Sequence, residues 1–93
     1  VPILSEELKL SGLVNKCSDK PLEDATKMAT TISQLPPLAV SMIKKNVNFA
    51  LNNNRKQTID RETYAQSFLG NTEDYTEGVK AFIEKRKPVF QGK

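Results

Sequence analysis

The sequence predicts a mainly α-helical fold with at most one short strand, near Leu13–Cys17. Two observations predict it. Apolar residues recur in steps of three and four along most of the chain, which is typical of amphipathic helices. Proline, serine, threonine and glycine stand where those apolar stripes begin and end, as helix caps and stops do. We therefore expect five helices in succession.

The first two helices are expected over residues 6–11 and 21–34. Ser5 is a plausible N-cap for the first helix, and Gly12 a plausible stop. The short extended segment follows, and Pro21 then suits the first position of the second helix. The apolar stripe of that helix comprises Leu22, Ala25, Met28, Ala29, Ile32 and Leu35.

The remaining helices are expected over residues 37–51, 58–69 and 73–86. Pro36 and Pro37 separate the second helix from the third, whose apolar side comprises Ala39, Met42, Ile43, Val47 and Ala50. A polar connection follows, and Thr58 can cap the fourth helix. Thr72 can cap the fifth, and Pro88 forces that helix to stop at or before residue 87.

Composition places the chain among small or partial domains. It has 93 residues, 38% of them apolar and 6% aromatic, with no tryptophan, so its own core would be thin. We expect it to be a piece of a longer protein. No apolar run approaches the roughly 20 residues that span a bilayer, and no signal peptide is visible. The single Cys17 cannot form an internal disulfide, which predicts a reducing, cytoplasmic location.

The inventory of reactive side chains is short. There is no histidine, which removes the commonest general base and most transition-metal sites. Three adjacent acidic pairs could suggest acid–base chemistry, but each lies in the first turn of an expected helix, where the helix dipole favours it. They are Glu6–Glu7, Glu23–Asp24 and Glu73–Asp74. We therefore predict no catalytic residue and no metal site within these 93 residues.

The charge of the chain is concentrated near its C-terminus. Residues 77–93 hold five basic and two acidic side chains, a net +3 that equals the charge of the whole chain. Lys85 and Arg86 follow Phe82 by three and four residues, so a ring and a cation could share one helix face. That pairing suits a nucleotide, with the ring on the base and the cation on a phosphate. The alternative is a packed phenylalanine beside a solvated basic rim.

Three segments resemble the C-terminal third of the crotonase family, the enoyl-CoA hydratases and isomerases. They are SEELKLSGLVNK at residues 5–16, LPPLAVSMIKKNVN at 35–48 and TEDYTEGVKAFIEKRKPVFQGK at 72–93. The pattern D-x-x-E-G-x-x-A-F-x-E-K-R-x-P-x-F, from Asp74 to Phe90, is the most specific part. The resemblance implies a helical C-terminal segment of a crotonase-type α/β fold.

Further expectations follow from the resemblance. Residues 1–20 would end the crotonase core, and residues 21–93 would form a helical domain that covers coenzyme A and assembles trimers or hexamers. Phe82 would approach the adenine and Lys85 the nucleotide phosphate. The segments that polarise the thioester and move protons would precede this stretch. Coenzyme A is part of the substrate, so no separate cofactor is expected.

The leading interpretation is therefore a C-terminal fragment of an enoyl-CoA hydratase/isomerase-like enzyme of fatty acid metabolism. The fragment would be inactive alone and would contact an acyl-CoA thioester. The reaction expected of the whole enzyme is reversible addition of water across a 2-enoyl-CoA double bond. A double-bond isomerase is almost as compatible, because the deciding residues would lie upstream. The alternative is a non-catalytic helical oligomerisation module. Nucleic-acid binding is disfavoured because the positive charge forms one short cluster rather than a stripe, and no membrane partner is expected.

Overall fold

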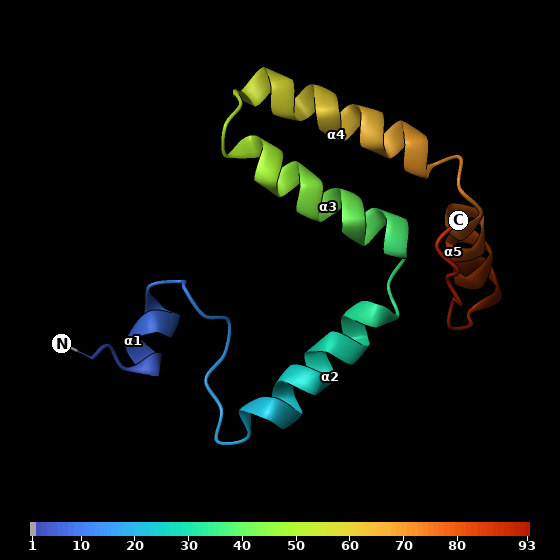
Figure 1. Cartoon of the computed structure of the whole chain (residues 1–93). Coiled ribbons are helices and arrows are strands. Elements are labelled where there is room, and N and C mark those ends of the chain that lie inside the picture. The colour runs from blue at the N-terminus through green and yellow to red at the C-terminus, as the bar shows by residue number, and fades with distance from the viewer. Residues whose placement is uncertain (1) are drawn as a thin grey trace. The chain divides into compact units, whose positions relative to one another are not determined.

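The computed structural model describes residues 2–93 and is helical along most of that range (Figure 1). Its helices are α1 (Ser5–Leu10), α2 (Pro21–Ser33), α3 (Pro37–Ala50), α4 (Arg55–Leu69) and α5 (Glu73–Glu84). No strand occurs among residues 2–93, and Leu13–Cys17 is irregular. The expectation of a mainly α fold is confirmed.

The chain divides into two compact units, of which the first ends at Thr31 and the second begins at Ile32. In the first unit, Lys16 Nζ lies 3.2 Å from the Asp24 carboxylate. Hydrogen bonds from Ser18 and then Lys16 lower the pKa of Asp24. The expected division between residues 20 and 21 stays a prediction.

Most helix boundaries follow from local sequence. α2 and α3 begin at proline, and both end one residue before the predicted position. Thr72 caps α5, since its side chain accepts a hydrogen bond from the Tyr75 backbone N–H at 3.2 Å. The expected cap at Ser5 is wrong: α1 already includes Ser5, and Leu4 precedes it without a side-chain cap.

Two boundaries differ by more. α4 begins at Arg55 rather than Thr58 because Asn54 and Gln57 form a capping box, in which each side chain accepts from the other's backbone N–H at 2.9 and 3.0 Å. α5 ends at Glu84, two residues early, because Lys85 turns into the left-handed conformation.

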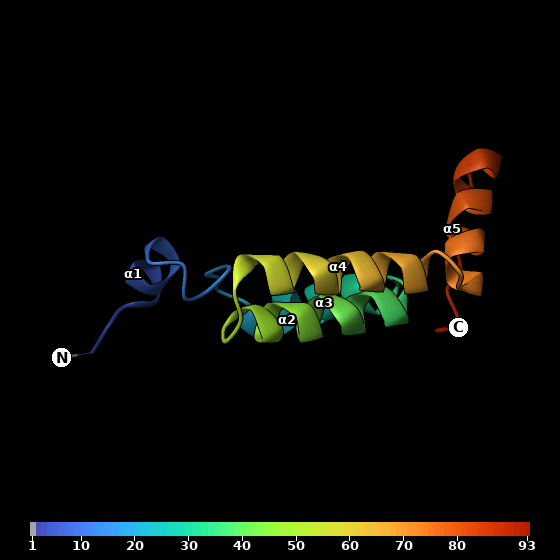
Figure 2. The same cartoon turned by 90° about the horizontal axis from the view of Figure 1, so that it is seen from above.

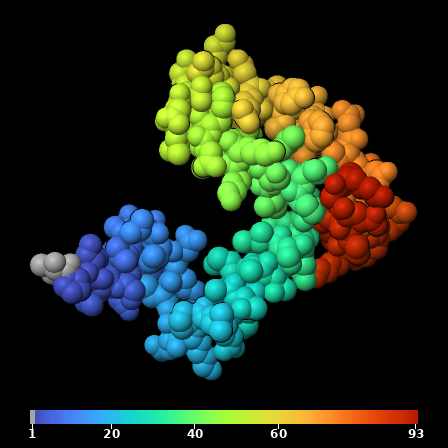
Figure 3. Space-filling view, viewed as in Figure 1, coloured from blue at the N-terminus to red at the C-terminus, as the bar shows by residue number. Residues whose placement is uncertain are grey.

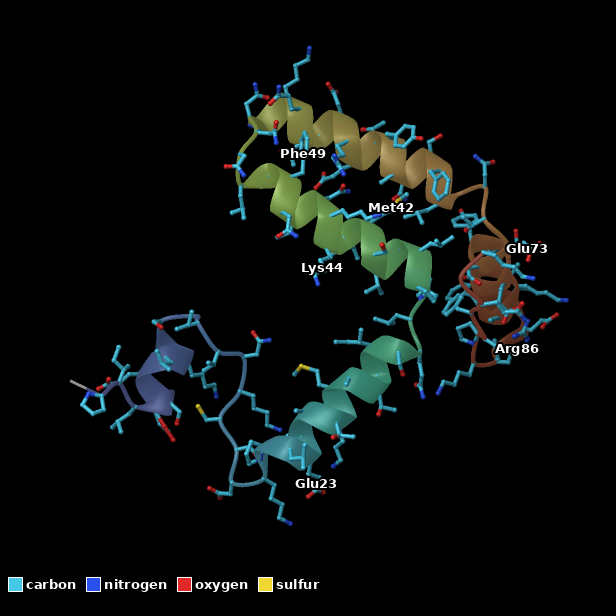
Figure 4. All side chains as sticks on the ribbon, in the orientation of Figure 1. Glu23, Met42, Lys44, Phe49, Glu73 and Arg86 are labelled. Carbon is cyan, nitrogen blue, oxygen red and sulfur yellow. The ribbon has the colours of Figure 1, made fainter. Side chains whose placement is uncertain are left out.

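In the second unit, α3 and α4 form an antiparallel pair, which both views show side by side (Figures 1 and 2). Arg61 of α4 joins them. Its Nε donates to Asn46 Oδ1 at 3.0 Å, and its guanidinium lies 4.5 Å from the centre of the Phe49 ring. Phe49 and Met42 are labelled on α3 in Figure 4. A groove of about 690 Å³ runs between the two helices.

The core of the described chain is small. Ala65 and Ala81 are its buried apolar residues, whereas Ile43 and Val47 on α3 are 63% and 61% exposed. Among residues 2–93, no helix is long and apolar enough to cross a membrane. The helices therefore leave much of their apolar surface uncovered within this chain.

Candidate functional site

The most elaborate bonding in the chain joins the C-terminal tail, residues 85–93, to α5. The Asp74 carboxylate accepts hydrogen bonds from the backbone N–H groups of Gln91 and Gly92, both at 2.8 Å. The backbone N–H of Asp74 in turn donates to the carbonyl of Lys93 at 2.8 Å. Asp74 is 4% exposed, so this nearly buried carboxylate has its partners in the tail. The tail consequently runs back to the start of α5.

A second attachment lies nearer the end of α5. Both terminal nitrogens of Arg86 donate to the Glu77 carboxylate at 2.8 Å, a two-point ion pair, and Arg86 Nε donates to Glu84. The Val89 backbone N–H also donates to Glu77, at 2.7 Å. We call Asp74, Glu77 and Arg86, with the tail backbone that they bind, the tail clasp.

The hydrogen bonds of the tail clasp shift the pKa values of Glu77 and Arg86. Hydrogen bonds from Arg86, and next from the Val89 backbone, lower the pKa of Glu77 to about 2. Hydrogen bonds to Glu77 and Glu84 raise the pKa of Arg86 above its ordinary value. Glu77 is therefore ionised and Arg86 protonated at neutral pH, which keeps the pair intact.

Gly78 lies beneath the returning tail. A Cβ atom placed on Gly78 would be 3.6 Å from the Phe90 ring, which is ordinary van der Waals contact. Within residues 2–93 the neighbour of this glycine is a side chain of the same tail. In the space-filling view α5 and the tail form one continuous red body (Figure 3). Residues 88–90 thus fold back onto α5.

Lys85 stands at the turn between α5 and the tail. Its φ of 53° and ψ of 43° are left-handed, a conformation that costs a residue with a side chain roughly 1–2 kcal/mol. The Lys85 N–H donates to the Phe82 carbonyl at 3.3 Å and the Arg86 N–H to the Ala81 carbonyl at 3.0 Å. This is the Schellman arrangement, whose left-handed position is usually glycine.

Two of the three cations in the Lys85–Lys87 run are already bonded. Arg86 belongs to the tail clasp, and Lys87 Nζ donates to Gln34 Oε1 at 2.9 Å. Lys85 is exposed and has no ion pair within the part of the chain that the structure describes. The bonding thus leaves Lys85 as the available cation of the run.

The two residues that the sequence singled out, Phe82 and Lys85, both lie exposed at the C-terminal end of α5. The Phe82 side chain is 85% exposed. Because the helix ends at Glu84, helical spacing does not bring Lys85 or Arg86 over the ring. Figure 4 labels Arg86 beside this end of α5 and Glu73 at the other.

An apolar groove of about 380 Å³ follows the same helix. It is lined by Pro36, Leu38, Ala39, Leu69, Thr72, Asp74, Tyr75, Gly78, Val79, Phe82 and Phe90. Ligand pockets commonly measure about 300–1,000 Å³. Over residues 2–93, no three acidic, cysteine or histidine side chains are grouped closely enough to hold a metal ion.

Comparison with known proteins decides the family. A family profile for enoyl-CoA hydratase/isomerase matches residues 2–93. The chain belongs to this family. A probable mitochondrial enoyl-CoA hydratase of Arabidopsis thaliana is 39% identical to this chain over 83 residues, which are 87% of this chain and 28% of the relative.

Relatives named for other reactions match the same stretch. The 1,2-epoxyphenylacetyl-CoA isomerase of Escherichia coli is 37% identical over 76 residues, which are 81% of this chain and 29% of the relative.

The crystal structure of an enoyl-CoA hydratase from Polaromonas superposes with a TM-score of 0.91 at 30% identity, covering 96% of this chain and 35% of that one. This family member thus spans about a third of its relatives' length.

Proposed function

We propose that this chain is the C-terminal part of an enzyme that acts on acyl-CoA thioesters of fatty acid metabolism, and that it contributes nucleotide contacts and subunit assembly. The expected reaction is reversible addition of water to a 2-enoyl-CoA. Double-bond isomerisation is the close alternative, because relatives named as hydratase and as isomerase match this region about equally well. The groups that act on the thioester would lie outside residues 2–93.

Within the chain, Phe82 and Lys85 are the proposed contacts to coenzyme A. The observation that carries this is that both side chains are exposed at the end of α5, one a flat ring and the other a cation that has no ion pair among the described residues. The ring offers a stacking surface for adenine, and the ammonium offers a charge-assisted contact to phosphate. The family resemblance predicts both roles.

The remaining parts of the proposal concern partners and location. Exposed apolar residues on α3 support self-association, as a trimer or hexamer of the whole protein. Coenzyme A enters with the substrate, and no separate cofactor, nucleic acid or membrane partner is proposed. We keep the cytoplasm as the proposed location on the strength of a single unpaired cysteine.

Replacing Lys85 by alanine in the whole protein tests the nucleotide contact. A charge-assisted hydrogen bond of roughly 1.5–3 kcal/mol predicts that KM for a CoA ester rises about 10-fold or more. The kcat should change little, since the contact lies far from the reacting carbon. Lys80→Ala, at an exposed lysine within α5, is the matched control and should leave KM unchanged.

A truncated substrate sharpens this test. A pantetheine thioester lacks the nucleotide, so the Lys85→Ala effect should largely vanish with it, and it should also shrink in high salt. An unchanged KM for the CoA ester in Lys85→Ala would show that the basic cluster is only a solvated helix end and does not contact the nucleotide.

A non-catalytic oligomerisation module is the second candidate. The thin core and exposed apolar stripe favour it as much as they favour an enzyme subunit. Turnover of an enoyl-CoA by the whole protein separates the two, because a module without chemistry would assemble normally and show none.

A further inference from the structure

The left-handed lysine is the unusual feature of the α5 terminus. Lys85 is the single non-glycine residue with a positive φ in the range 2–93. Glycine is the ordinary occupant of this position in a Schellman motif, because it has no Cβ to clash. A strained conformation persists when surrounding contacts determine it, and such residues gather at ligand sites.

The contacts that determine it come from the next residue. The Arg86 guanidinium binds Glu77 through two hydrogen bonds of 2.8 Å and also binds Glu84, so the chain must reverse directly after α5. The Val89 N–H then adds a third bond to Glu77 at 2.7 Å. Two tail residues, Arg86 and Val89, are therefore fixed to one carboxylate of α5, with Lys85 in the bend between the helix and the tail.

We propose that Glu77 is a positioning residue for nucleotide binding: by holding Arg86 and Val89, it keeps Lys85 in the bend from which its ammonium meets a phosphate. This inference rests on the proposed function of Lys85. Glu77 itself, paired with Arg86, is not a phosphate ligand. It acts through the backbone conformation of Lys85.

The sign of the electrostatic effect makes the proposal testable. Glu77→Gln removes a negative charge near the proposed phosphate site, so simple charge attraction would strengthen binding of a phosphate. Loss of positioning would instead weaken phosphate binding, because glutamine cannot form the two-point ion pair that fixes Arg86. A weaker nucleotide contact in Glu77→Gln therefore cannot come from the change in charge.

The experiment compares KM values of the whole enzyme for a CoA ester and its pantetheine counterpart. Glu77→Gln should raise the KM ratio of the CoA ester to the pantetheine ester about 3- to 10-fold, with kcat on the pantetheine ester unchanged. Glu73→Gln is the matched control, since it makes the same charge change at the exposed far end of α5, where Glu73 has a 3.9 Å ion pair with Lys93 and, among the described residues, no hydrogen bond or ion pair with Arg86 or Val89. Its ratio should equal that of the unmodified protein.

A double-mutant cycle shows whether Glu77 acts through Lys85. The double variant Glu77→Gln/Lys85→Ala should have the same KM ratio as Lys85→Ala alone, because nothing then remains to be positioned. Independent, additive effects would overturn the proposal, as would a ratio that is unchanged or lowered in Glu77→Gln. If Lys85→Ala raises the KM ratio and Glu77→Gln does not, the proposed contact of Lys85 with the nucleotide stands and only the positioning role of Glu77 is rejected.

A second variant, Arg86→Lys, tests the same proposal if the Glu77→Gln protein does not fold. Arg86→Lys keeps the net charge but cannot bind Glu77 at two points and Glu84 at once. It should raise the KM ratio in the same direction. An Arg86→Lys enzyme with an unchanged ratio would contradict the proposal on its own.

Discussion

The α3–α4 pair and the α5–tail unit stabilise themselves in different ways. α3 and α4 meet along an apolar groove and share few specific bonds, chiefly the contacts of Arg61 with Asn46 and Phe49. The tail, by contrast, is tied to α5 by hydrogen bonds that its backbone N–H groups donate to the carboxylates of Asp74 and Glu77. One region leaves apolar surface uncovered, and the other satisfies its polar groups internally.

The residues of a specific sequence motif can therefore serve either the fold or the binding of a ligand. The residues of the pattern from Asp74 to Phe90 largely serve the fold: two carboxylates bind the tail, and Gly78 accommodates the Phe90 ring. Phe82 and Lys85 belong to the same pattern but stay exposed. These two are therefore the members for which a role outside the chain's own packing must be sought.

The largest expected effect concerns the α3–α4 pair. Exposed apolar patches beyond a few hundred Å² tend to find partners, so we expect the 93-residue chain alone to form dimers or larger species. The double substitution Ile43→Ser/Val47→Ser should shift it toward monomer, whereas Lys44→Ser at an exposed neighbouring position should not. Sedimentation velocity measures this. A sharply monomeric unmodified chain at high micromolar concentration would contradict the expectation.

The next effect breaks the tail clasp. Asp74→Ala removes the acceptor for the Gln91 and Gly92 N–H groups, at a cost of about 1–3 kcal/mol. In the whole protein, these two amides should exchange with solvent deuterium about 5- to 150-fold faster, which is the same energy expressed as a rate. Asp60→Ala, at an exposed position of α4, is the control. Unchanged exchange in Asp74→Ala would mean that the tail is held by other contacts.

A pH titration tests the second attachment. The pKa of Glu77 is lowered to about 2 from an ordinary 4.5, so its contribution to stability is complete above pH 4.5 and is lost as pH falls toward 2. The NMR shift of the Val89 amide should therefore stay constant down to about pH 4 and change below it. In Glu77→Gln, the NMR shift of the Val89 amide should not show this pH dependence, because the titrating carboxyl group is gone. A midpoint near 4.5 would show that the Arg86 contact is weak in solution.

The smallest effect is a gain in stability. Lys85→Gly relieves the left-handed strain, which glycine tolerates, and part of the gain is offset by the greater freedom of glycine in the unfolded chain. The net increase should be at most about 1 kcal/mol and should appear as a slightly higher Tm than in Lys85→Ala. Both variants should nonetheless lose the nucleotide contact equally. A Lys85→Gly protein that binds the CoA ester normally would show that the side chain has no binding role.

Much of the helical fold could be predicted from local sequence. Pro21, Pro37 and Thr72 mark helix starts by rules that need no tertiary contact, and the structure confirms these starts. The start of α4 was missed although its signal was present, since Asn54 and Gln57 have capping-box spacing. The end of α5 could not be predicted locally, because Arg86 reaches back nine residues to Glu77.

The roles of the site residues were predicted less completely. Asp74 was interpreted as a charge favoured by the helix dipole, and its bonds to Gln91 and Gly92 depend on a tail reversal that only the folded chain shows. The spacing of Asp74 and Glu77 was an available signal, since residues three apart lie on one helix face. Phe82 and Lys85 stay predictions as ligand contacts.

A crystal structure of the whole protein with coenzyme A bound would show whether Lys85 and Phe82 contact the nucleotide. We predict that Lys85 Nζ lies within about 4 Å of a phosphate oxygen, the usual limit for an ion pair. We also predict that the Phe82 ring faces the adenine, with Lys85 still left-handed and Arg86 still on Glu77. Coenzyme A bound elsewhere, with Lys85 directed to solvent and the tail clasp intact, would contradict the account.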